Sequence, residues 1–277
     1  MINTSEKNKS EYELTDRQYN KLSDLIYKTA GINLGDNKKE LVHARLCKVI
    51  RKRKISGFSE YISILENDKT EEELTNLLDS IATNVTHFFR ENKHFEFLAE
   101  NIKDRGYNGN LRIWSAGCSS GEEPYSLAIT LFEHILNQSS PLPTIVATDI
   151  STKILSRAVN GVYPMKSVDT LDKSMLRKYF LKGNKSNQGI VKVKKEVSKI
   201  VDFKRLNLME HFSFNPKFDV IFCRNVMIYF DNQTREKLVK KFYDVLNPGG
   251  FLIIGHSESL NGVTHPYNYV KPTIYRK

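Results

Sequence analysis

The stretch LRIWSAGCSSGEEPYSLAIT, residues 111–130, joins an apolar run to a helix-like run through a turn of small residues. Residues 111–117 have the continuous apolar character of a buried parallel strand, and residues 123–136 have the spacing of an amphipathic helix. A turn of this kind is typical of open α/β sheets, which bind nucleotide-like ligands near the helix N-terminus. Here the turn continues into two carboxylates, Glu122 and Glu123.

The same alternation of strand and helix continues to the end of the chain. Apolar runs predict strands, amphipathic runs predict helices, and Asn247-Pro248-Gly249-Gly250 is expected to stop the last helix. The C-terminal run reads as an edge strand, because it contains Pro272. The strands are expected at 144–150, 201–207, 218–225, 249–258 and 269–277, and the helices at 152–159 and 233–246. This order predicts a doubly wound α/β sheet.

The chain upstream of this sheet has a different pattern. Residues 1–13 read as a charged, disordered tail, and residues 14–80 as a small all-helical domain. Its helices are expected at 14–31, 38–54, 59–67 and 71–84. Residues 81–277 are expected to form the α/β domain. Within it, residues from about 160 to 200 interrupt the alternation of strands and helices, and apolar side chains there alternate with basic ones. We expect this insertion to be a small antiparallel β-subdomain with a basic face.

The formal net charge is +10, and much of the basic excess is local. Residues 38–54 contain eight Lys or Arg and one acid, and residues 160–205 contain twelve Lys or Arg and four acids. Such patches suggest docking surfaces for an acidic partner, either nucleic acid or a Glu-rich protein. On the first patch the exposed face of the predicted helix carries Arg45, Lys48, Arg51, Lys52 and Arg53.

The turn after the first strand is unsuited to a pyrophosphate. It lacks the dinucleotide pattern G-x-G-x-x-G, and Glu122 stands where a P-loop has lysine. Glu122 and Glu123 would repel phosphates but attract the sulfonium and ammonium groups of S-adenosylmethionine (SAM). The alternative is that both glutamates only complement the helix dipole.

Polar residues at other strand ends favour the same ligand. Asp149 ends the second strand, where nucleoside-binding folds place an acceptor for ribose hydroxyls; alternatively, it caps the next helix. Asn207 and Asn225 end later strands, where amides suit an adenine edge or an amino-acid group, although asparagine is also common in turns.

The segment between the two domains, residues 82–95, interleaves polar and aromatic side chains. An interdomain connector would account for Phe88 and Phe89, but not for the polar residues Asn84, Thr86 and Arg90. We therefore include these three among the candidate site residues.

The cysteines and histidines give no sign of a metal site. The three cysteines are scattered and odd in number, which favours a reducing cytoplasm over disulfides. His87 and His94 have no cysteine or histidine partner at metal-ligand spacing, and His256 stands alone in the sequence, so we expect structural histidines and no metal. No signal peptide and no apolar run of membrane-spanning length are found, so a cytoplasmic protein without membrane insertion is expected.

Six ordered segments together resemble one family. They are TNVTHFFRE, WSAGCSSGEEPYSLAI, ATDIS, FDVIFCRNVMIYFD, LNPGGFLIIGHSE and the basic helix that precedes them. In this order they closely resemble the chemotaxis receptor methyltransferases, the CheR family, from about residue 14 to the C-terminus. The resemblance implies a helical N-terminal domain, a SAM-binding α/β domain and a small β-subdomain. It also implies SAM-dependent methylation of receptor glutamates to glutamyl methyl esters, with S-adenosylhomocysteine as the other product.

The resemblance also implies roles for individual residues. Glu123 would bind the methionine end of SAM and Asp149 the ribose, while Arg90 and Tyr229 would lie nearest the transferred methyl group. The remaining implied SAM contacts are Asn84, Thr86, Asn207, Leu208, Asn225 and Val226, together with Arg90 itself. Peptide-tethered members of the family tend to have a Gly-x-Gly loop in the β-subdomain. Here the loop reads Gly183-Asn184-Lys185, which departs from that pattern at its third residue.

The implied chemistry agrees with the residue types present. A substrate glutamate is ionised near neutrality, with a reference pKa of about 4.3, so it needs no general base. Arg90 can orient it by bidentate hydrogen bonds, and the basic helix can dock on acidic receptor helices. We expect a monomer that binds no nucleic acid.

Two alternatives remain. A nucleic-acid methyltransferase would suit the basic patches, but residues 225–228 read Asn-Val-Met-Ile rather than an Asn- or Asp-Pro-Pro-aromatic motif, and no Pro-Cys occurs. A SAM-binding sensor without turnover would not need Arg90 and Tyr229.

Overall fold

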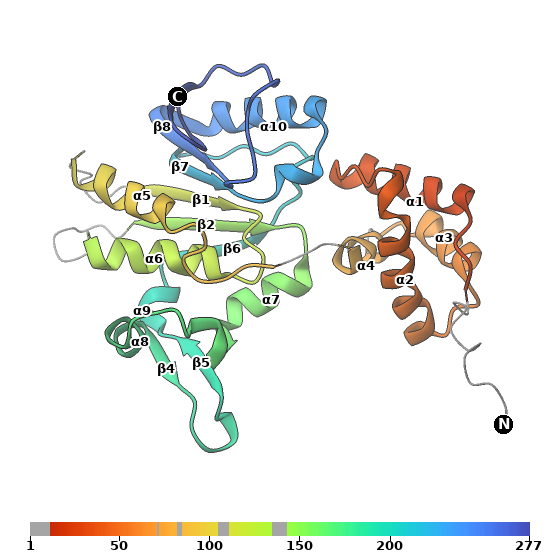
Figure 1. Ribbon diagram of the computed structural model, residues 1–277, viewed down its shortest axis with the longest axis horizontal. Helices are drawn as coiled ribbons and strands as arrows, with labels where there is room; N and C mark the ends of the chain where they lie inside the picture. Colours follow the sequence, from red (N-terminus) through yellow and green to blue (C-terminus); the bar gives the residue numbers. More distant parts are fainter. Residues whose placement is uncertain (1–11, 71, 82–84, 105–110, 135–142) are drawn as a thin grey trace, which may run out of the picture. The chain divides into compact units, whose positions relative to one another are not determined.

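The computed structural model describes residues 12–70, 72–81, 85–104, 111–134 and 143–277. The chain divides into two compact units, residues 1–83 and 84–277 (Figure 1). The expected disordered tail at residues 1–13 lies almost wholly outside the described residues, as does Asn84.

The first unit is helical, as predicted. Thr15 caps its first helix with a capping box to Gln18, and Gly31 ends it in the left-handed conformation (φ 69°). Buried apolar side chains line one face of each helix and form the core of this unit. The helices are α1 (Asp16–Ala30), η1 (Asp36–Lys38), α2 (Lys39–Arg53), α3 (Phe58–Asn67) and α4 (Glu72–Ile81).

The second unit is built on a seven-stranded sheet, and the predicted doubly wound α/β fold is confirmed. The spatial strand order is β6-β2-β1-β7-β8-β10-β9, and the first five of these strands are parallel. The strands are β1 (Arg112–Ala116), β2 (Thr144–Asp149), β6 (Val201–Arg205), β7 (Phe218–Cys223), β8 (Leu246–Ile254), β9 (Asn268–Lys271) and β10 (Ile274–Arg276). Because β1 pairs with β2 on one side and with β7 on the other, the chain changes direction across the sheet at β1, which is the topological switch point.

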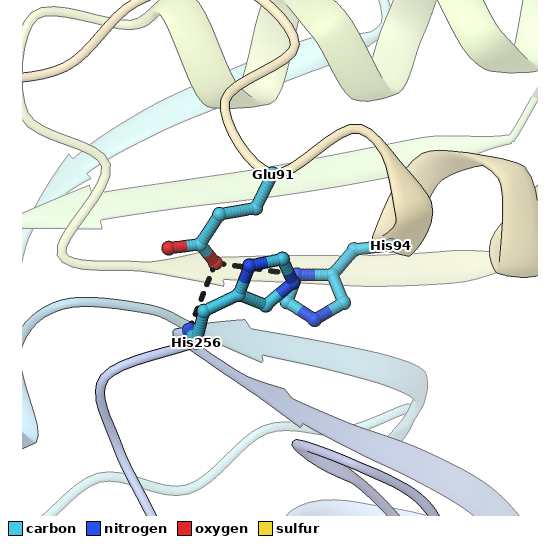
Figure 2. A group of neighbouring side chains, drawn as sticks. All are labelled: Glu91, His94 and His256. Atoms are coloured by element: carbon cyan, nitrogen blue, oxygen red, sulfur yellow. Dashed lines mark hydrogen bonds and ion pairs between the residues drawn. The ribbon is translucent and has the colours of Figure 1, made fainter.

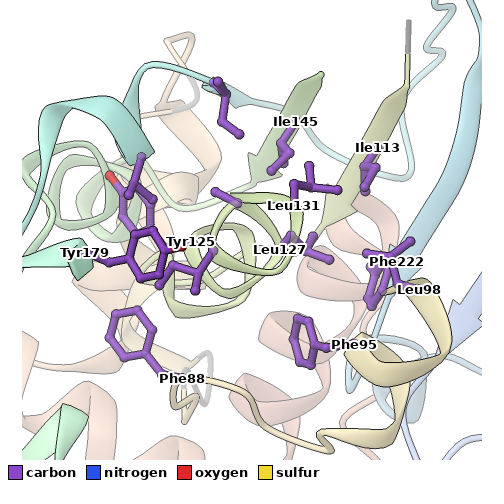
Figure 3. Packing of buried hydrophobic residues seen from close by; sticks show 14 of the residues in the cluster. Phe88, Phe95, Leu98, Ile113, Tyr125, Leu127, Leu131, Ile145, Tyr179 and Phe222 are labelled. Carbon is purple, nitrogen blue, oxygen red and sulfur yellow. The ribbon is translucent and has the colours of Figure 1, made fainter. Parts of the chain in front are cut away.

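Alternate side chains of the central strands cover the two faces of the sheet. Ile113, Ile145 and Phe222 belong to one large apolar cluster with α5 (Lys93–Asp104), α6 (Glu122–His134) and the β-subdomain, part of which is drawn in Figure 3. Trp114 points to the opposite face, where its ring contacts Phe218 and, on α10 (Asn232–Val245), Phe242. Helix α5 begins at Lys93, inside the segment 82–95, and the sequence patterns did not predict it.

The insertion is a small antiparallel subdomain, as expected. Its sheet has the order β3-β5-β4, and its three strands are β3 (Val162–Pro164), β4 (Phe180–Lys182) and β5 (Ile190–Val193). Short helices and 3-10 turns lie before, between and directly after these strands. They are α7 (Thr152–Asn160), η2 (Met165–Val168), α8 (Lys173–Tyr179), η3 (Lys185–Asn187) and α9 (Lys195–Ser198).

Two details near the C-terminus differ from the prediction. Residues 247–250 do not form a turn between α10 and β8, because β8 begins directly at Leu246 with extended backbone. They instead form an irregularity within β8, where the register to β7 shifts and Gly249 has a φ of 76°. The C-terminal run is two strands, β9 and β10, rather than one, and Pro272 lies in the turn between them, where no ladder hydrogen bond is required of it.

Within the described part of the chain, none of the helices has the length and apolar character needed to cross a membrane.

Candidate functional site

The candidate site lies where the parallel strands end. Ala116 at the end of β1 is paired with Thr148, next to Asp149, and β2 and β7 flank β1 on its two sides. The carboxyl ends of neighbouring parallel strands meet at one edge of a sheet, so the segments that follow β1, β2, β6, β7 and β8 are brought together there. This edge collects most of the residues expected from the sequence.

The turn after β1 is held by backbone hydrogen bonds to β2. The amides of Gly117 and Cys118 both donate to the Thr148 carbonyl at 2.8 Å, and the Ser119 amide donates to Asp149 Oδ2 at 2.9 Å. Asp149 Oδ1 accepts from the Ser151 amide at 3.0 Å. The capping alternative for Asp149 is wrong, since Ser151 is the N-cap of α7. Asp149 instead holds the turn after β1 in place through its hydrogen bond with the Ser119 amide.

Gly117 permits a close approach between the turn and the segment that follows β7. Its φ is 82°, and a Cβ atom on it would lie 2.4 Å from Val226 Cγ2. Gly117 therefore lets Val226, one of the expected cofactor contacts, lie directly against the turn.

We expect Gly117→Ala to destabilise the protein and to weaken binding of S-adenosylhomocysteine. The left-handed backbone costs alanine about 1–2 kcal/mol, and the overlap with Val226 adds about 1–3 kcal/mol. Urea denaturation and calorimetric titration measure the two effects. Gly189→Ala is the matched control, because Gly189 has a similar φ of 87° but no atom within 4 Å of its would-be Cβ. Equal losses in both variants would contradict a specific role for the contact with Val226.

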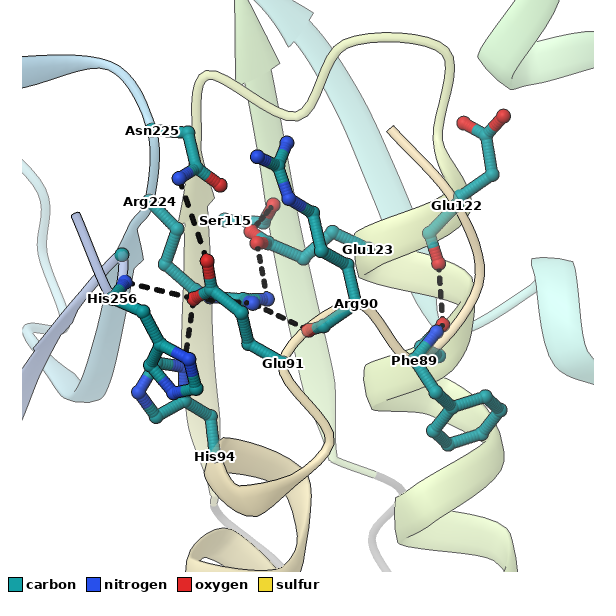
Figure 4. A network of polar contacts seen from close by, with 12 residues as sticks. Phe89, Arg90, Glu91, His94, Ser115, Glu122, Glu123, Arg224, Asn225 and His256 are labelled. Carbon is teal, nitrogen blue, oxygen red and sulfur yellow. Dashed lines mark hydrogen bonds and ion pairs between the residues drawn. The ribbon is translucent and has the colours of Figure 1, made fainter. Parts of the chain in front are cut away.

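The two glutamates of the turn have different surroundings. Glu123 is nearly buried, and its carboxylate accepts from Ser115 Oγ at 2.7 Å and from Arg224 Nη1 at 3.0 Å. Burial raises the pKa of the Glu123 carboxyl, and the charge of Arg224 opposes that shift. Glu122 accepts instead from Ser120 Oγ at 2.6 Å, and burial raises the pKa of its carboxyl as well. Of these two glutamates, Glu123 takes part in the polar network of Figure 4 through its carboxylate, and Glu122 does not.

Glu122 belongs to a different pocket. Together with Ser120 it lines a cavity of about 370 Å³ whose other walls include Arg157, Asn160 and Tyr163. Consecutive residues of a helix point in different directions, so the carboxylates of Glu122 and Glu123 lie in different surroundings.

Arg224, which the sequence patterns did not single out, connects the parts of the site. Its side chain is 2% exposed, and its guanidinium donates to the carboxylates of Glu123 and Glu91, at 3.0 Å and 2.9 Å, and to the Arg90 carbonyl (Figure 4). The only sequence signal was a charged residue directly after the buried strand β7. Arg224 balances the charge of two largely buried carboxylates and fixes the backbone beside Arg90.

The residues after β7 are held by a second missed carboxylate, Glu258. It is 8% exposed and accepts from the amides of Gly255, Asn225 and Ile228 at 2.6, 2.8 and 3.1 Å. Burial raises the pKa of the Glu258 carboxyl against the effect of these hydrogen bonds. Asn225 has a φ of 58°, which turns the chain sharply at the strand end.

The remaining expected residues are placed as follows. Asn207 follows β6, is buried and accepts from the Met209 amide at 3.0 Å, and Leu208 is buried beside it. Thr86, Arg90 and Tyr229 are half-buried, and Arg90 Nη1 donates to the Val85 carbonyl at 2.8 Å. The pairing of Arg90 with Tyr229 stays a prediction.

Two histidines that stand apart in the sequence meet in the structure. The rings of His94 and His256 lie 4.8 Å apart between centroids, and Glu91 Oε2 is 3.6 Å from His94 Nδ1 (Figure 2). The spacing of the histidines in the sequence gave no sign that His94 and His256 lie side by side. Burial and the charge of Arg224 lower the pKa of His94 to about 3, so its imidazole is neutral at physiological pH.

The basic residues of α2 belong to the other unit of the chain. Lys48, Arg51 and Lys52 are exposed, whereas Arg53 forms an ion pair with Glu73 and Arg45 donates to the Ile81 carbonyl. Arg45 and Arg53 thus have partners within their own unit.

Comparison with known proteins identifies the family. Residues 84–276 match the model described as "CheR methyltransferase, SAM binding domain", and residues 17–82 match "CheR methyltransferase, all-alpha domain". The chain is 42% identical over 273 residues to a chemotaxis protein methyltransferase of Borreliella burgdorferi, with 95% of each chain covered. It is 38% and 37% identical over 263 residues to proteins of the same name from Salmonella typhimurium and Escherichia coli, covering 95% of this chain and 90% and 91% of theirs. The chain belongs to the CheR methyltransferase family.

Proposed function

We propose that this protein transfers a methyl group from SAM to glutamate side chains of chemoreceptors, for sensory adaptation in bacterial chemotaxis. The products are glutamyl 5-O-methyl esters and S-adenosylhomocysteine, and the enzyme acts in the cytoplasm as a monomer. The observation that carries this proposal is the position of Asp149, which ends β2 and holds the turn between β1 and Glu123 at the switch point of the sheet, in a chain of the CheR family.

The cofactor occupies the edge of the sheet beside the turn 117–121. Asp149 accepts from the ribose hydroxyls, and Glu123 accepts from the ammonium of the methionine group. The Glu123 carboxylate already accepts hydrogen bonds from Ser115 and Arg224, so it accepts from the ammonium of SAM only with its remaining lone pairs. Other contacts come from Asn84, Thr86, Arg90, Asn207, Leu208, Asn225 and Val226.

Transfer is a direct displacement at the methyl carbon. A carboxylate oxygen of the substrate glutamate forms a bond to the methyl carbon while the carbon–sulfur bond breaks, and the sulfur keeps that electron pair. No proton moves, so the protein contributes mainly by aligning oxygen, carbon and sulfur. Arg90 orients the substrate carboxylate by bidentate hydrogen bonds, and Tyr229 fixes its angle.

Methyl-labelled SAM tests the proposal. The protein is incubated with receptor-containing membranes or with nucleic acid, and the label is followed. Label on the receptor that base releases as methanol supports the ester. Label stable in DNA or RNA would overturn the proposal in favour of a nucleic-acid methyltransferase, and SAM binding without transfer to either would indicate a sensor.

The exposed basic residues of α2 dock on acidic helices of the receptor. Arg51→Ala with Lys52→Ala is expected to weaken receptor association on the order of tenfold, mainly through slower association at low salt. Biosensor binding to receptor membranes measures it. Lys237→Ala with Lys240→Ala, which removes the same charge from the exposed side of α10, is the control. An equal loss in both pairs would mean that only the net charge matters.

The β-subdomain is the candidate binding site for a receptor tethering peptide. Gly183 is required by packing, because a Cβ atom there would lie 1.9 Å from the Asn187 carbonyl oxygen. Lys185, at the position of the family's second glycine, has a φ of 48°, a conformation that glycine adopts without strain. The departure in sequence is therefore compatible with the backbone of a Gly-x-Gly loop. Titration with peptides from the C-termini of the host's own receptors tests this binding directly.

A further inference from the structure

Three side chains that could bind a metal ion converge beside the candidate methyl-transfer site. Glu91 lies in the turn just before α5, His94 lies in the first turn of α5, and His256 follows β8, 162 residues after His94 in the sequence (Figure 2). One ligand atom from each can be chosen so that all three lie within 4.8 Å of one another. Two of the three side chains are also held by neighbours that fix their orientation.

The hydrogen bonds of Thr273 define which nitrogen of His94 carries the proton. Thr273 Oγ1 donates to the Pro272 carbonyl at 2.6 Å, so it must accept from His94 Nε2 at 2.8 Å. His94 Nδ1 is then an unprotonated acceptor. It is buried, it has no hydrogen-bond partner among the residues that the structure describes, and the His94 side chain is 2% exposed.

This free lone pair faces a second acceptor. Glu91 Oε2 lies 3.6 Å from His94 Nδ1, and no proton is available between the two atoms. Two acceptors that face each other in a buried place are destabilising unless a positive group bridges them. Arg224 reaches only the Glu91 side of the pair, at 2.9 Å.

We propose that Glu91, His94 Nδ1 and His256 bind one divalent transition-metal ion of the zinc class, with the remaining coordination positions open. Zinc–nitrogen and zinc–oxygen bonds of about 2.0–2.2 Å place two ligands of a tetrahedral ion about 3.3–3.6 Å apart. The distance between Glu91 Oε2 and His94 Nδ1 is within this range. His256 is exposed, so its imidazole can turn to complete the set.

The surroundings are those of a metal site of moderate affinity. Thr273 orients His94 and Arg224 orients Glu91, which is the arrangement that outer partners give to metal ligands. The charge of Arg224 repels the ion and lowers its affinity, whereas the buried lone pair of His94 Nδ1 already faces Glu91 Oε2 at 3.6 Å. A bound ion would link the start of α5 to the segment after β8.

Zinc titration of the full chain, freed of metal with a chelator, tests this site. Calorimetry with Zn²⁺ is expected to show one equivalent bound, and Co²⁺ is expected to give the visible absorption of a site of low coordination number. His256→Ala should weaken Zn²⁺ binding about tenfold or more. Because His256 is exposed, this variant should fold normally, which circular dichroism checks.

A second histidine variant separates this site from adventitious binding. His211→Ala removes another exposed histidine and should leave Zn²⁺ affinity unchanged. Failure to bind Zn²⁺ at 1:1 stoichiometry, or equal affinity in the wild type and His256→Ala, would overturn the proposal. The titration uses neither SAM nor receptor, so its outcome is independent of the proposed methyl transfer.

Discussion

Replacing Arg90 with alanine is expected to lower the rate of methyl transfer about a hundredfold to a thousandfold, the range found when one preorganised donor is removed from an active site. In the proposed mechanism no proton is transferred, so positioning is the main contribution of the protein. Arg224 anchors the backbone of Arg90 through the Arg90 carbonyl (Figure 4), and the Arg90 side chain donates to the Val85 carbonyl at 2.8 Å. Its loss would leave the substrate carboxylate free to rotate away from the line of displacement.

The measurement is a single-turnover assay with labelled SAM and receptor membranes. Arg90→Lys is the matched variant: it keeps the charge but cannot form two parallel hydrogen bonds, so its rate should fall between those of wild type and Arg90→Ala. Calorimetry with S-adenosylhomocysteine separates cofactor binding from transfer. Wild-type rates in Arg90→Ala would refute the catalytic role of this residue.

Replacing Arg224 with methionine is expected to destabilise the second unit of the chain by about 3–5 kcal/mol, since breaking a buried ion pair leaves an uncompensated charge. Glu91 and Glu123 would both lose their charged partner. A buried carboxylate without a cation takes up a proton more readily, so the variant should bind S-adenosylhomocysteine less tightly as well.

Urea denaturation measures the loss of stability, and calorimetry measures the affinity. Arg205→Met, an exposed arginine at the end of β6, is the control and should lie within about 0.5 kcal/mol of wild type. Arg224→Lys should recover part of the stability, because one ammonium can stay close to only part of the acceptor set. A cost below about 1 kcal/mol in Arg224→Met would show that the network is weaker than its burial indicates.

The charge of the turn after β1 differs from the prediction in one respect. The sequence shows two adjacent glutamates, which indicates a strongly negative turn. In the structure Glu122 turns to another pocket, and Arg224 compensates Glu123. In the proposed function, selection of a cationic cofactor over a pyrophosphate therefore rests on a paired carboxylate and on Asp149, not on two free charges.

The sequence by itself determined the division into a helical part and an α/β part, most of the strands and helices, and the positions of Asp149 and Asn225 near strand ends. These features depend on periodicity, capping and turn chemistry, all of which act between residues close in the chain. The first unit and the parallel part of the sheet could be predicted for this reason.

Only the tertiary structure decided which of these residues are partners. Arg224 reaches Glu91 and Glu123 across 133 and 101 residues, and His94 reaches Thr273 across 179. Such contacts depend on the order and register of strands whose ends meet at one edge of the sheet, and no local pattern encodes that order. The buried charges were missed because a lone arginine or glutamate in a sequence gives no sign of the partner that makes its burial possible.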